Sequence, residues 1–492
     1  MKKVLSLIGV FLITSACFTQ DVLEQVPDEW RSAVNEALQK AGENKPALIR
    51  ALEETKDPEE LRIVAFCIAQ SAYRYFGGIG KETRYDCTTL SAELLLKNAR
   101  LALETRRKEY PWAQRLDDDK FLRFVCAYRN ETEQVFEFRE YVKAFDDLKN
   151  KVDEYACLYR DAVSDNRRIE VFKEMVYFIN TVWFAKKVKY QPRGMPDLNL
   201  KQLLEQGWGR CTDLTNGLIA ILRTFGVAAT GARAIWWAKE DSNHLWTLVW
   251  EPIEGKWLSI DSAGGGENNE AYFKKFIGDD KIGKVYIITP GEERSEVYKR
   301  ISRAADPWLP DYLEWYLLGR PMVDGTAMFG KVADLKLDGL PSNASVFLCA
   351  YNSGSWAALD ATKSSEDGKA VFKDVGAQDV LYAVCTPKMT RFGKALLPIK
   401  PPFILKENGT TESTVALEDS KGESFQSEIE KLPPETVFTL LAWTKEGFKE
   451  VSRGRTDKNG IAHIYNLKSD VVYLIAYKKD GKTVTTRPFI LE

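Results

Sequence analysis

The sequence feature that most constrains the fold is a duplication in the C-terminal third of the chain. The segment that starts at Val346 reads VFLCAYNSGSWAALDATKSSEDGKAVFKDVGAQDVLYAVC, and it aligns with VFTLLAWTKEGFKEVSRGRTDKNGIAHIYNLKSDVVYLIAY from Val437. A PPFIL motif after the first copy also matches RPFIL after the second. Both copies carry short alternating runs separated by Asp-Gly or Asn-Gly turns, which is the pattern of antiparallel strands. The duplication therefore predicts two small β-sandwiches, and we expect each to fold as a unit of its own.

The first third of the chain is patterned for helices and has few strand signals. The motifs PDE at Pro27 and DPEE at Asp57 are helix-start signatures, with acidic residues in the first turn. A further helix is predicted over 165–190. The chain thus predicts an N-terminal all-α region, an α+β core and two C-terminal all-β sandwich domains. The expected boundaries are a signal peptide at 1–16, a helical domain at 17–150, the core at 151–324, and the two sandwiches at 325–412 and 413–492.

The composition argues against several classes of function. The chain has a formal net charge of -2, and its basic and acidic residues are interspersed, so no surface for nucleic acid is expected. The eight cysteines include no CxxC spacing, which gives no support to a zinc site or a redox motif. No acidic loop indicates a calcium requirement. We therefore expect neither a metal nor a cofactor.

The first residues read as an export signal. Lys2 and Lys3 form a positive start, residues 4–13 form an apolar run too short to span a membrane, and small residues follow. The sequence ITSAC also resembles a bacterial lipobox with Cys17 as the lipidated residue, which we favour over simple secretion. No other segment is suited to cross a bilayer. We expect an exported lipoprotein of the bacterial cell envelope, in the periplasm or on the outer membrane surface, that meets the membrane through its N-terminal lipid only.

Residues 207–263 hold a cysteine, a histidine and an aspartate in positions that suit a thiol hydrolase. Cys211 opens a segment with apolar residues at helical spacing, which places its thiol at a helix N-terminus. Unpaired backbone N–H groups and the helix dipole there favour the thiolate and can receive a developing oxyanion. His244 lies in the run HLWTLVW and Asp261 follows KWLSI, and a turn at 252–255 predicts a β-hairpin that brings them together. The three residues then form a nucleophile, a base and an orienting acid.

Less specific interpretations of these residues must be weighed. Cys211 can be a small buried residue, or the three residues can survive in a groove that binds without turnover. The chain has only two histidines, and the other, His463, aligns with Val371 in the first copy of the duplication. A position that accepts valine is a strand packing position. His463 is therefore not expected to be catalytic, and His244 is the only candidate base.

The segments GRCTDLTNGLIAILRTFGVAAT, NHLWTLVWE and GKWLSIDSA resemble the core of the transglutaminase-like superfamily, a papain-related group of thiol enzymes. On this resemblance the core is an α+β papain/transglutaminase-like domain of an exported bacterial member, and Cys211, His244 and Asp261 fall on the nucleophile, base and acid of the family. Members often use a Trp or another donor upstream of the cysteine for the oxyanion. The candidates in this chain are left open. They are Trp183, Tyr190 and Trp208, with Trp246 as a further groove candidate on the face of His244.

The function expected from the residues and the resemblance is that of an exported peptidase or amidase that works through an acyl-enzyme on a peptide or glycopeptide. Two alternatives remain. One is transfer of a glutamine acyl group to an amine, as in transglutaminase cross-linking. The other is a catalytically inactive surface protein that binds a glycan or peptide. The C-terminal units resemble prealbumin-like or immunoglobulin-like modules and are expected to act as spacers or binding modules.

Overall fold

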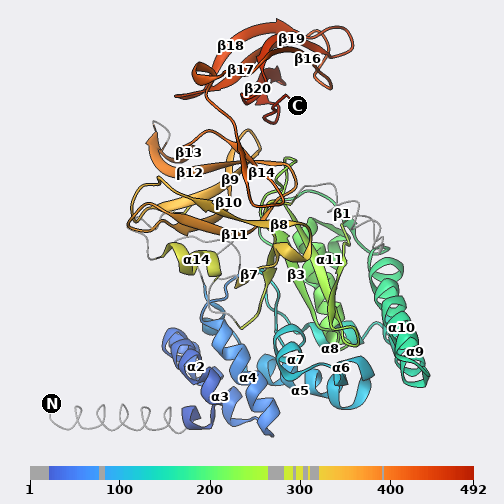
Figure 1. The fold of residues 1–492 in the computed structure, drawn as a ribbon. Helices are drawn as coiled ribbons and strands as arrows, with labels where there is room; N and C mark the ends of the chain where they lie inside the picture. The colour runs from blue at the N-terminus through green and yellow to red at the C-terminus, as the bar shows by residue number, and fades with distance from the viewer. Residues whose placement is uncertain are drawn as a thin grey trace, which may run out of the picture.

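The computed structural model describes residues 22–76, 84–263, 282–291, 295–302, 309–310, 321–390 and 393–491. The predicted signal peptide and Cys17 lie outside the described residues. Figure 1 shows helices at the N-terminal end of the molecule, a mixed core in the middle, and two groups of strands stacked beyond it. The chain is therefore multidomain, with an N-terminal all-α region, a central α+β core and a C-terminal all-β part. None of the helices in the part of the chain that the structure describes has the length and apolarity of a membrane-spanning segment.

The N-terminal helices begin where the sequence predicts. Asp28 opens α2, and Asp57 caps α4 because its side chain accepts a hydrogen bond of 2.8 Å from the Glu60 N–H. Ser91 caps α5 in the same way. The apolar centre of α4 is buried among its neighbours and includes Cys67. The helices of this region are α2 (Asp28–Lys40), α3 (Lys45–Glu53), α4 (Pro58–Ser71), α5 (Ala92–Glu104), α6 (Pro111–Gln114), α7 (Asp118–Phe124) and α8 (Phe138–Lys143).

A long helical pair precedes the core sheet. Helix α9 (Asp146–Asp161) packs against α10 (Asp165–Tyr177), and a π-helical turn at Phe178–Phe184 continues α10. The helix predicted over 165–190 is thus shorter than expected, because a strand, β1 (Lys189–Tyr190), already begins before residue 190. Strand β1 pairs in parallel with β2 (Trp208–Gly209), and α11 (Leu200–Gln206) lies between them in the chain. This arrangement leads the backbone directly to Cys211.

The core combines one buried helix with an antiparallel sheet. Helix α12 (Cys211–Thr224) buries the apolar stripe predicted from the sequence, and Gly226 follows it with a φ of +72°. The Val227 N–H donates to the Leu222 carbonyl at 3.0 Å and closes the helix end. The sheet has the order β5-β4-β3-β6-β7. Its strands are β3 (Ala229–Ala234), β4 (His244–Glu251), β5 (Lys256–Ile260), β6 (Tyr286–Ile288) and β7 (Met322–Asp324).

The duplicated segments form two β-sandwiches, as the sequence predicts. In the first, the larger sheet has the order β10-β9-β12-β14-β15 with β13 beside β12, and the smaller sheet pairs β11 with β8. In the second, the sheets are β18-β17-β20-β21 and β16-β19. The strands of the first are β8 (Val332–Leu337), β9 (Ser345–Asn352), β10 (Ser355–Lys363), β11 (Ala370–Gly376), β12 (Val380–Thr390), β13 (Gly393–Pro398), β14 (Phe403–Leu405) and β15 (Thr411–Ser413). Those of the second are β16 (Ser424–Ile429), β17 (Val437–Thr444), β18 (Gly447–Arg455), β19 (Ala462–Lys468), β20 (Tyr473–Lys479) and β21 (Lys482–Thr485).

The first sandwich is not independent of the core, contrary to the expectation from the duplication. One hydrophobic cluster contains Leu245 and Tyr286 from the core sheet together with Phe347 of the sandwich. The Tyr286 hydroxyl donates to the Leu359 carbonyl at 2.9 Å, and the buried Lys284 ammonium donates to the Lys373 carbonyl at 2.8 Å. These contacts join the two parts into one continuous core.

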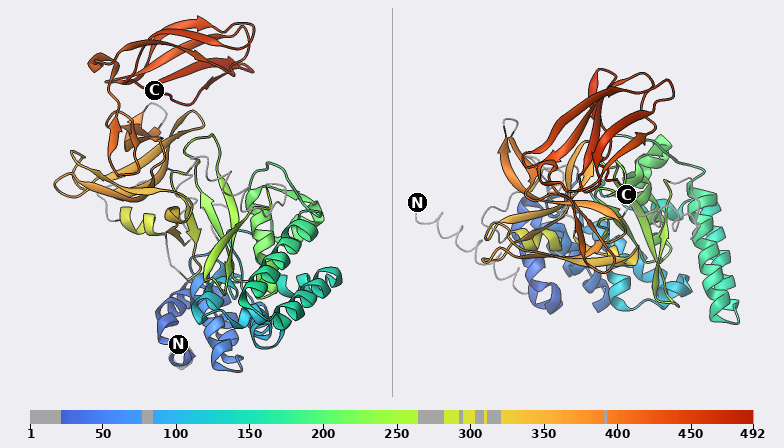
Figure 2. Two further views of the ribbon diagram at one scale, coloured as in Figure 1. Left: turned by 45° about the vertical axis from the view of Figure 1, so that its right-hand side comes forward. Right: turned by 45° about the horizontal axis from the view of Figure 1, so that its top comes forward.

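The second sandwich has a separate core and lies at the end of the molecule farthest from the N-terminal helices (Figure 2). Its contacts with the rest of the chain include a hydrogen bond of 2.9 Å between the Thr485 and Tyr351 hydroxyls. The expectation of a self-contained unit therefore suits the second sandwich better than the first.

Candidate active site

Cys211 is the first residue of α12 and is 9% exposed. The preceding residue, Arg210, has an extended backbone with φ -79° and ψ 173°, and its N–H donates to the Asp213 carboxylate at 2.9 Å. Asp213 therefore holds the chain at the point where it turns into the helix. The thiol is consequently at the positive end of a helix dipole, where a negative sulfur is favoured.

His244 and Asp261 meet across the predicted hairpin. His244 is the first residue of β4, and Asp261 directly follows β5, whose Ile260 is paired with Thr247 of β4. The Nε2 atom of His244 lies 3.0 Å from Oδ2 of Asp261. The second carboxylate oxygen of Asp261 accepts from the Ala263 N–H at 2.9 Å, which fixes the direction of the carboxyl group. His244 also interacts with the Cys211 thiol, and each of the two groups shifts the pKa of the other.

The charges at the site favour a thiolate and an imidazolium. Burial acts to raise the pKa of Cys211, but the hydrogen bond and the charge of His244, with a contribution from Arg233, outweigh it and leave that pKa below its usual value. Burial acts to lower the pKa of His244, but Asp261 and the thiolate raise it to about 10. In contrast, burial raises the pKa of Cys67 to about 12 and that of Cys87 to about 11. Cys211 differs from these buried thiols because the hydrogen bond and the charge of His244 outweigh the effect of burial on its pKa.

A buried charge network lies behind the site and was not predicted from the sequence. Arg233 of β3 forms an ion pair of 2.8 Å with Glu131, and both side chains are at most 1% exposed. Glu131 belongs to a buried loop, 128–133, between α7 and α8. In the same loop the Thr132 hydroxyl donates to Asp197 at 2.6 Å. The N-terminal region therefore touches the charges that act on Cys211. In the sequence this loop is visible only as a run of polar residues between apolar segments. Such a run does not predict which residue each side chain contacts.

The aromatic candidates are distributed differently from what was expected. Trp183 is not placed for an oxyanion, because its Nε1–H donates to the Asp147 carboxylate at 2.9 Å within the helical pair. Trp246 is fully buried and stacks on His244 with ring centroids 5.9 Å apart, so its ring supports the imidazole. Trp208 lies on β2 opposite Lys189. In the part of the chain that the structure describes, no interaction joins the Trp208 ring to Cys211, His244 or Asp261.

Tyr190 is the upstream candidate that the structure brings to the site. Its strand, β1, pairs it with Gly209, two residues before Cys211 in the chain. Burial raises the pKa of Tyr190, and the negative charges of Cys211 and Asp261 raise it further. The side chain is 49% exposed. Tyr190 is therefore close to the thiol and open to an incoming molecule.

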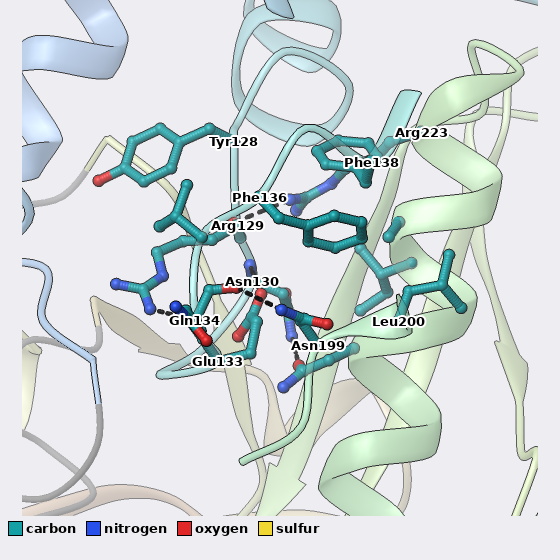
Figure 3. A pocket seen from close by; sticks show the side chains of 14 residues that line it. Tyr128, Arg129, Asn130, Glu133, Gln134, Phe136, Phe138, Asn199, Leu200 and Arg223 are labelled. Atoms are coloured by element: carbon teal, nitrogen blue, oxygen red, sulfur yellow. Dashed lines mark hydrogen bonds between the residues drawn. The ribbon is translucent and has the colours of Figure 1, made fainter. Parts of the chain in front are cut away.

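A cavity beside α12 is too small for a substrate. It has a volume of about 20 Å³, room for about one water molecule, and it lies among Arg129, Asn130 and Asn216. Figure 3 shows it between the buried loop and the helix, and the Asn130 amide donates to the Asn216 side chain at 2.9 Å. Neither Cys211 nor His244 lines this cavity.

The site combines a cysteine at the start of a buried helix with a histidine and an aspartate at the antiparallel core sheet. Residues 169–262 match the model of the transglutaminase-like superfamily. The matched segment contains Cys211, His244 and Asp261, so this chain carries a transglutaminase-like core. This superfamily generally contains cysteine enzymes.

Comparison with solved structures gives a weaker result. The crystal structure of red sea bream transglutaminase matches at 12% identity and a TM-score of 0.22, covering 72% of this chain and 73% of that chain. Comparison with curated protein sequences gives no significant match.

Proposed function

We propose that this chain is a thiol-dependent amide-bond enzyme in which Cys211 is the nucleophile, His244 the acid and base, and Asp261 the orienting acid. The observation that carries the proposal is the position of His244, with Nε2 at 3.0 Å from Asp261 and with its charge acting on the Cys211 thiol, whose pKa it lowers. This is the arrangement that activates a thiol and protonates a leaving amine. The family match over the same residues supports it.

The geometry suits a two-step reaction. The Cys211 thiolate attacks the amide carbonyl carbon, a C–S bond forms, and the carbonyl oxygen becomes an oxyanion near the first N–H groups of α12. The imidazolium of His244 then donates its proton to the amide nitrogen, the C–N bond breaks, and the amine leaves. A water molecule attacks the thioester, His244 accepts a proton from it, and the acid product leaves Cys211 as a thiolate. Asp261 stabilises the charged imidazole throughout.

Tyr190 is the second oxyanion donor in this proposal. Its strand places it beside Cys211, and its partial exposure lets the hydroxyl reach a bound carbonyl. Trp183 does not fill this role in the proposal because its only side-chain donor, the indole N–H, donates to the Asp147 carboxylate. Hydrolysis and transfer to an amine differ only in the molecule that reaches the thioester. We favour hydrolysis of a peptide or glycopeptide by an exported protein that is anchored through a lipid on Cys17.

A labelling experiment tests the proposal. The purified mature protein is treated with a thiol-directed acylating probe at pH 6, and the labelled cysteines are identified by peptide mapping. We expect label at Cys211 and its loss in His244→Ala, with the exposed Cys157 as the reference for an ordinary thiol. Faster labelling of Cys157 than of Cys211 in the folded wild-type protein would contradict the assignment. A thioester that forms but never turns over on peptide amides, with or without an added amine, would favour a binding protein.

A further inference from the structure

The loop that leads into His244 is held by a residue of the first β-sandwich. Loop 237–243 is the part of the β3–β4 connection that precedes His244, and it closes on itself because the Trp237 N–H donates to the Ser242 carbonyl at 3.0 Å. Asn352, the last residue of β9, is 1% exposed. Its side-chain nitrogen lies 3.0 Å from the Trp237 carbonyl, 2.8 Å from that of Glu240 and 3.1 Å from that of Ser242. One amide group therefore organises the whole loop.

The second β-sandwich contacts the same loop. Arg487, which follows β21, lies 2.9 Å from the Asp241 carboxylate through Nη1 and donates to the Ala238 carbonyl through Nη2. Asn352 and Arg487 are far apart in the chain and come from different copies of the duplication. Both nevertheless end on the loop that precedes His244.

The loop reaches the imidazole through Trp237. The Trp237 ring is 1% exposed and lies 6.2 Å from the His244 ring at an interplanar angle of 30°. The same ring stacks on Trp246 with centroids 6.0 Å apart. A stacked aromatic face restricts the rotation of the imidazole and favours its cationic form. Movement of the loop would therefore change both the direction and the charge of His244.

The second copy of the duplication shows that the sandwich fold does not require this use of Asn352. Each of the strands β9 and β17 ends at a hairpin, where Asn352 is paired with Ser355 and Thr444 is paired with Gly447. The Thr444 hydroxyl donates at 2.6 Å to the Gly447 carbonyl, which belongs to its own hairpin. At the equivalent position of the first copy, the Asn352 side chain instead contacts a loop of the core domain.

We propose that the β-sandwiches position the catalytic histidine, with Asn352 as the principal positioning residue and Arg487 as a second anchor, both acting through loop 237–243 and Trp237. This proposal rests on the proposed function of Cys211 and His244. It assigns to the sandwiches a part in catalysis in place of the spacer or binding role expected from the sequence.

The test is the pH dependence of Cys211 alkylation by iodoacetamide in the full-length mature chain. Asn352→Leu keeps a similar shape but has no donor and adds no charge. We expect alkylation at pH 6 to slow by about 10-fold and its midpoint to move up toward about 8.5, the pKa of an ordinary thiol. Thr444→Val, the matched substitution in the second copy, should leave the profile unchanged. A folded Asn352→Leu protein with the wild-type profile would overturn the proposal.

Arg487→Gln is the second variant, because its side chain is partly exposed and folding is not expected to depend on it. It should slow alkylation at pH 6 by about 3-fold, in the same direction as Asn352→Leu. If Asn352→Leu does not fold, an unchanged profile in Arg487→Gln overturns the proposal. If the proposed function is wrong, the result is different. Wild-type Cys211 would then be alkylated no faster than Cys157, and neither Asn352→Leu nor Arg487→Gln would change that rate.

Discussion

Nε2 of His244 lies 3.0 Å from Oδ2 of Asp261, and this contact restricts the direction of the imidazole ring beside Cys211. The aspartate is 3% exposed and sits at the end of β5, so its charge acts on the imidazole with little screening by water. The raised pKa of His244 therefore depends on a carboxylate that is buried at the end of β5.

Substitutions of His244 and Asp261 should reduce the rate of acylation at Cys211 to different extents. His244→Ala removes both the proton acceptor and the proton donor, and each role contributes roughly 10²- to 10⁴-fold. Asp261→Asn can still accept a hydrogen bond from the ring, but it removes the charge that raises the pKa of His244, so a smaller loss is expected. The measurement is the rate of acylation at Cys211. His463→Val is the control, because His463 is 45% exposed on β19 and should not affect the rate. Equal rates for His244→Ala and wild type would refute the assignment.

The rate of amide cleavage should have a bell-shaped pH dependence. The pKa of Cys211 lies below its usual value, so the thiolate is present above that lowered pKa and is lost as the pH falls through it. The pKa of His244 is raised to about 10, so the proton needed by the leaving amine is present below that value and is lost above it. We expect a plateau through neutral pH in kcat/KM. A single rise near the pKa of a free thiol, with no fall on the alkaline side, would contradict the ion pair.

Glu131→Gln should destabilise the fold, since it removes the buried carboxylate that lies 2.8 Å from the Arg233 guanidinium. Breaking one side of a buried ion pair costs about 3–5 kcal/mol in the free energy of unfolding. Denaturant unfolding at pH 7 measures this change. Glu407→Gln is the comparison, because the pair of Glu407 with Lys331 is more than half exposed and should contribute little. Equal stability of the two variants would show that the Arg233 pair is not important for stability.

Truncation should separate the two β-sandwiches. Removal of residues 415–492 leaves strand β15 and the cluster shared by Tyr286 and Phe347 intact, so we expect soluble, folded protein. Removal of 325–492 exposes the core side of that cluster and should give aggregated or unfolded protein. Circular dichroism and size-exclusion chromatography measure both. A folded, monomeric protein that ends at residue 324 would show that the first sandwich is dispensable for the core.

The sequence predicts contacts that depend on local pattern. His244 and Asp261 flank one hairpin turn, so strand periodicity alone brings them together, and the helix that starts at Cys211 follows from its apolar spacing. The pattern does not predict partners that are distant in the chain. Glu131 reaches Arg233, and Asp147 takes the Trp183 indole, only because separate elements pack together. Local alternation also cannot show that the first sandwich shares its apolar face with the core.

The use of Asn352 has a consequence for how the duplicated segments can change. Two similar stretches in one chain are open to recombination, which would replace one copy with the other. A replacement of the first copy by the second would put a threonine where Asn352 holds three carbonyls of loop 237–243. The reverse replacement would place an asparagine at a hairpin that has no such loop to hold. The two copies are thus expected to diverge independently in sequence. Fewer substitutions should be tolerated in the copy that contacts the core.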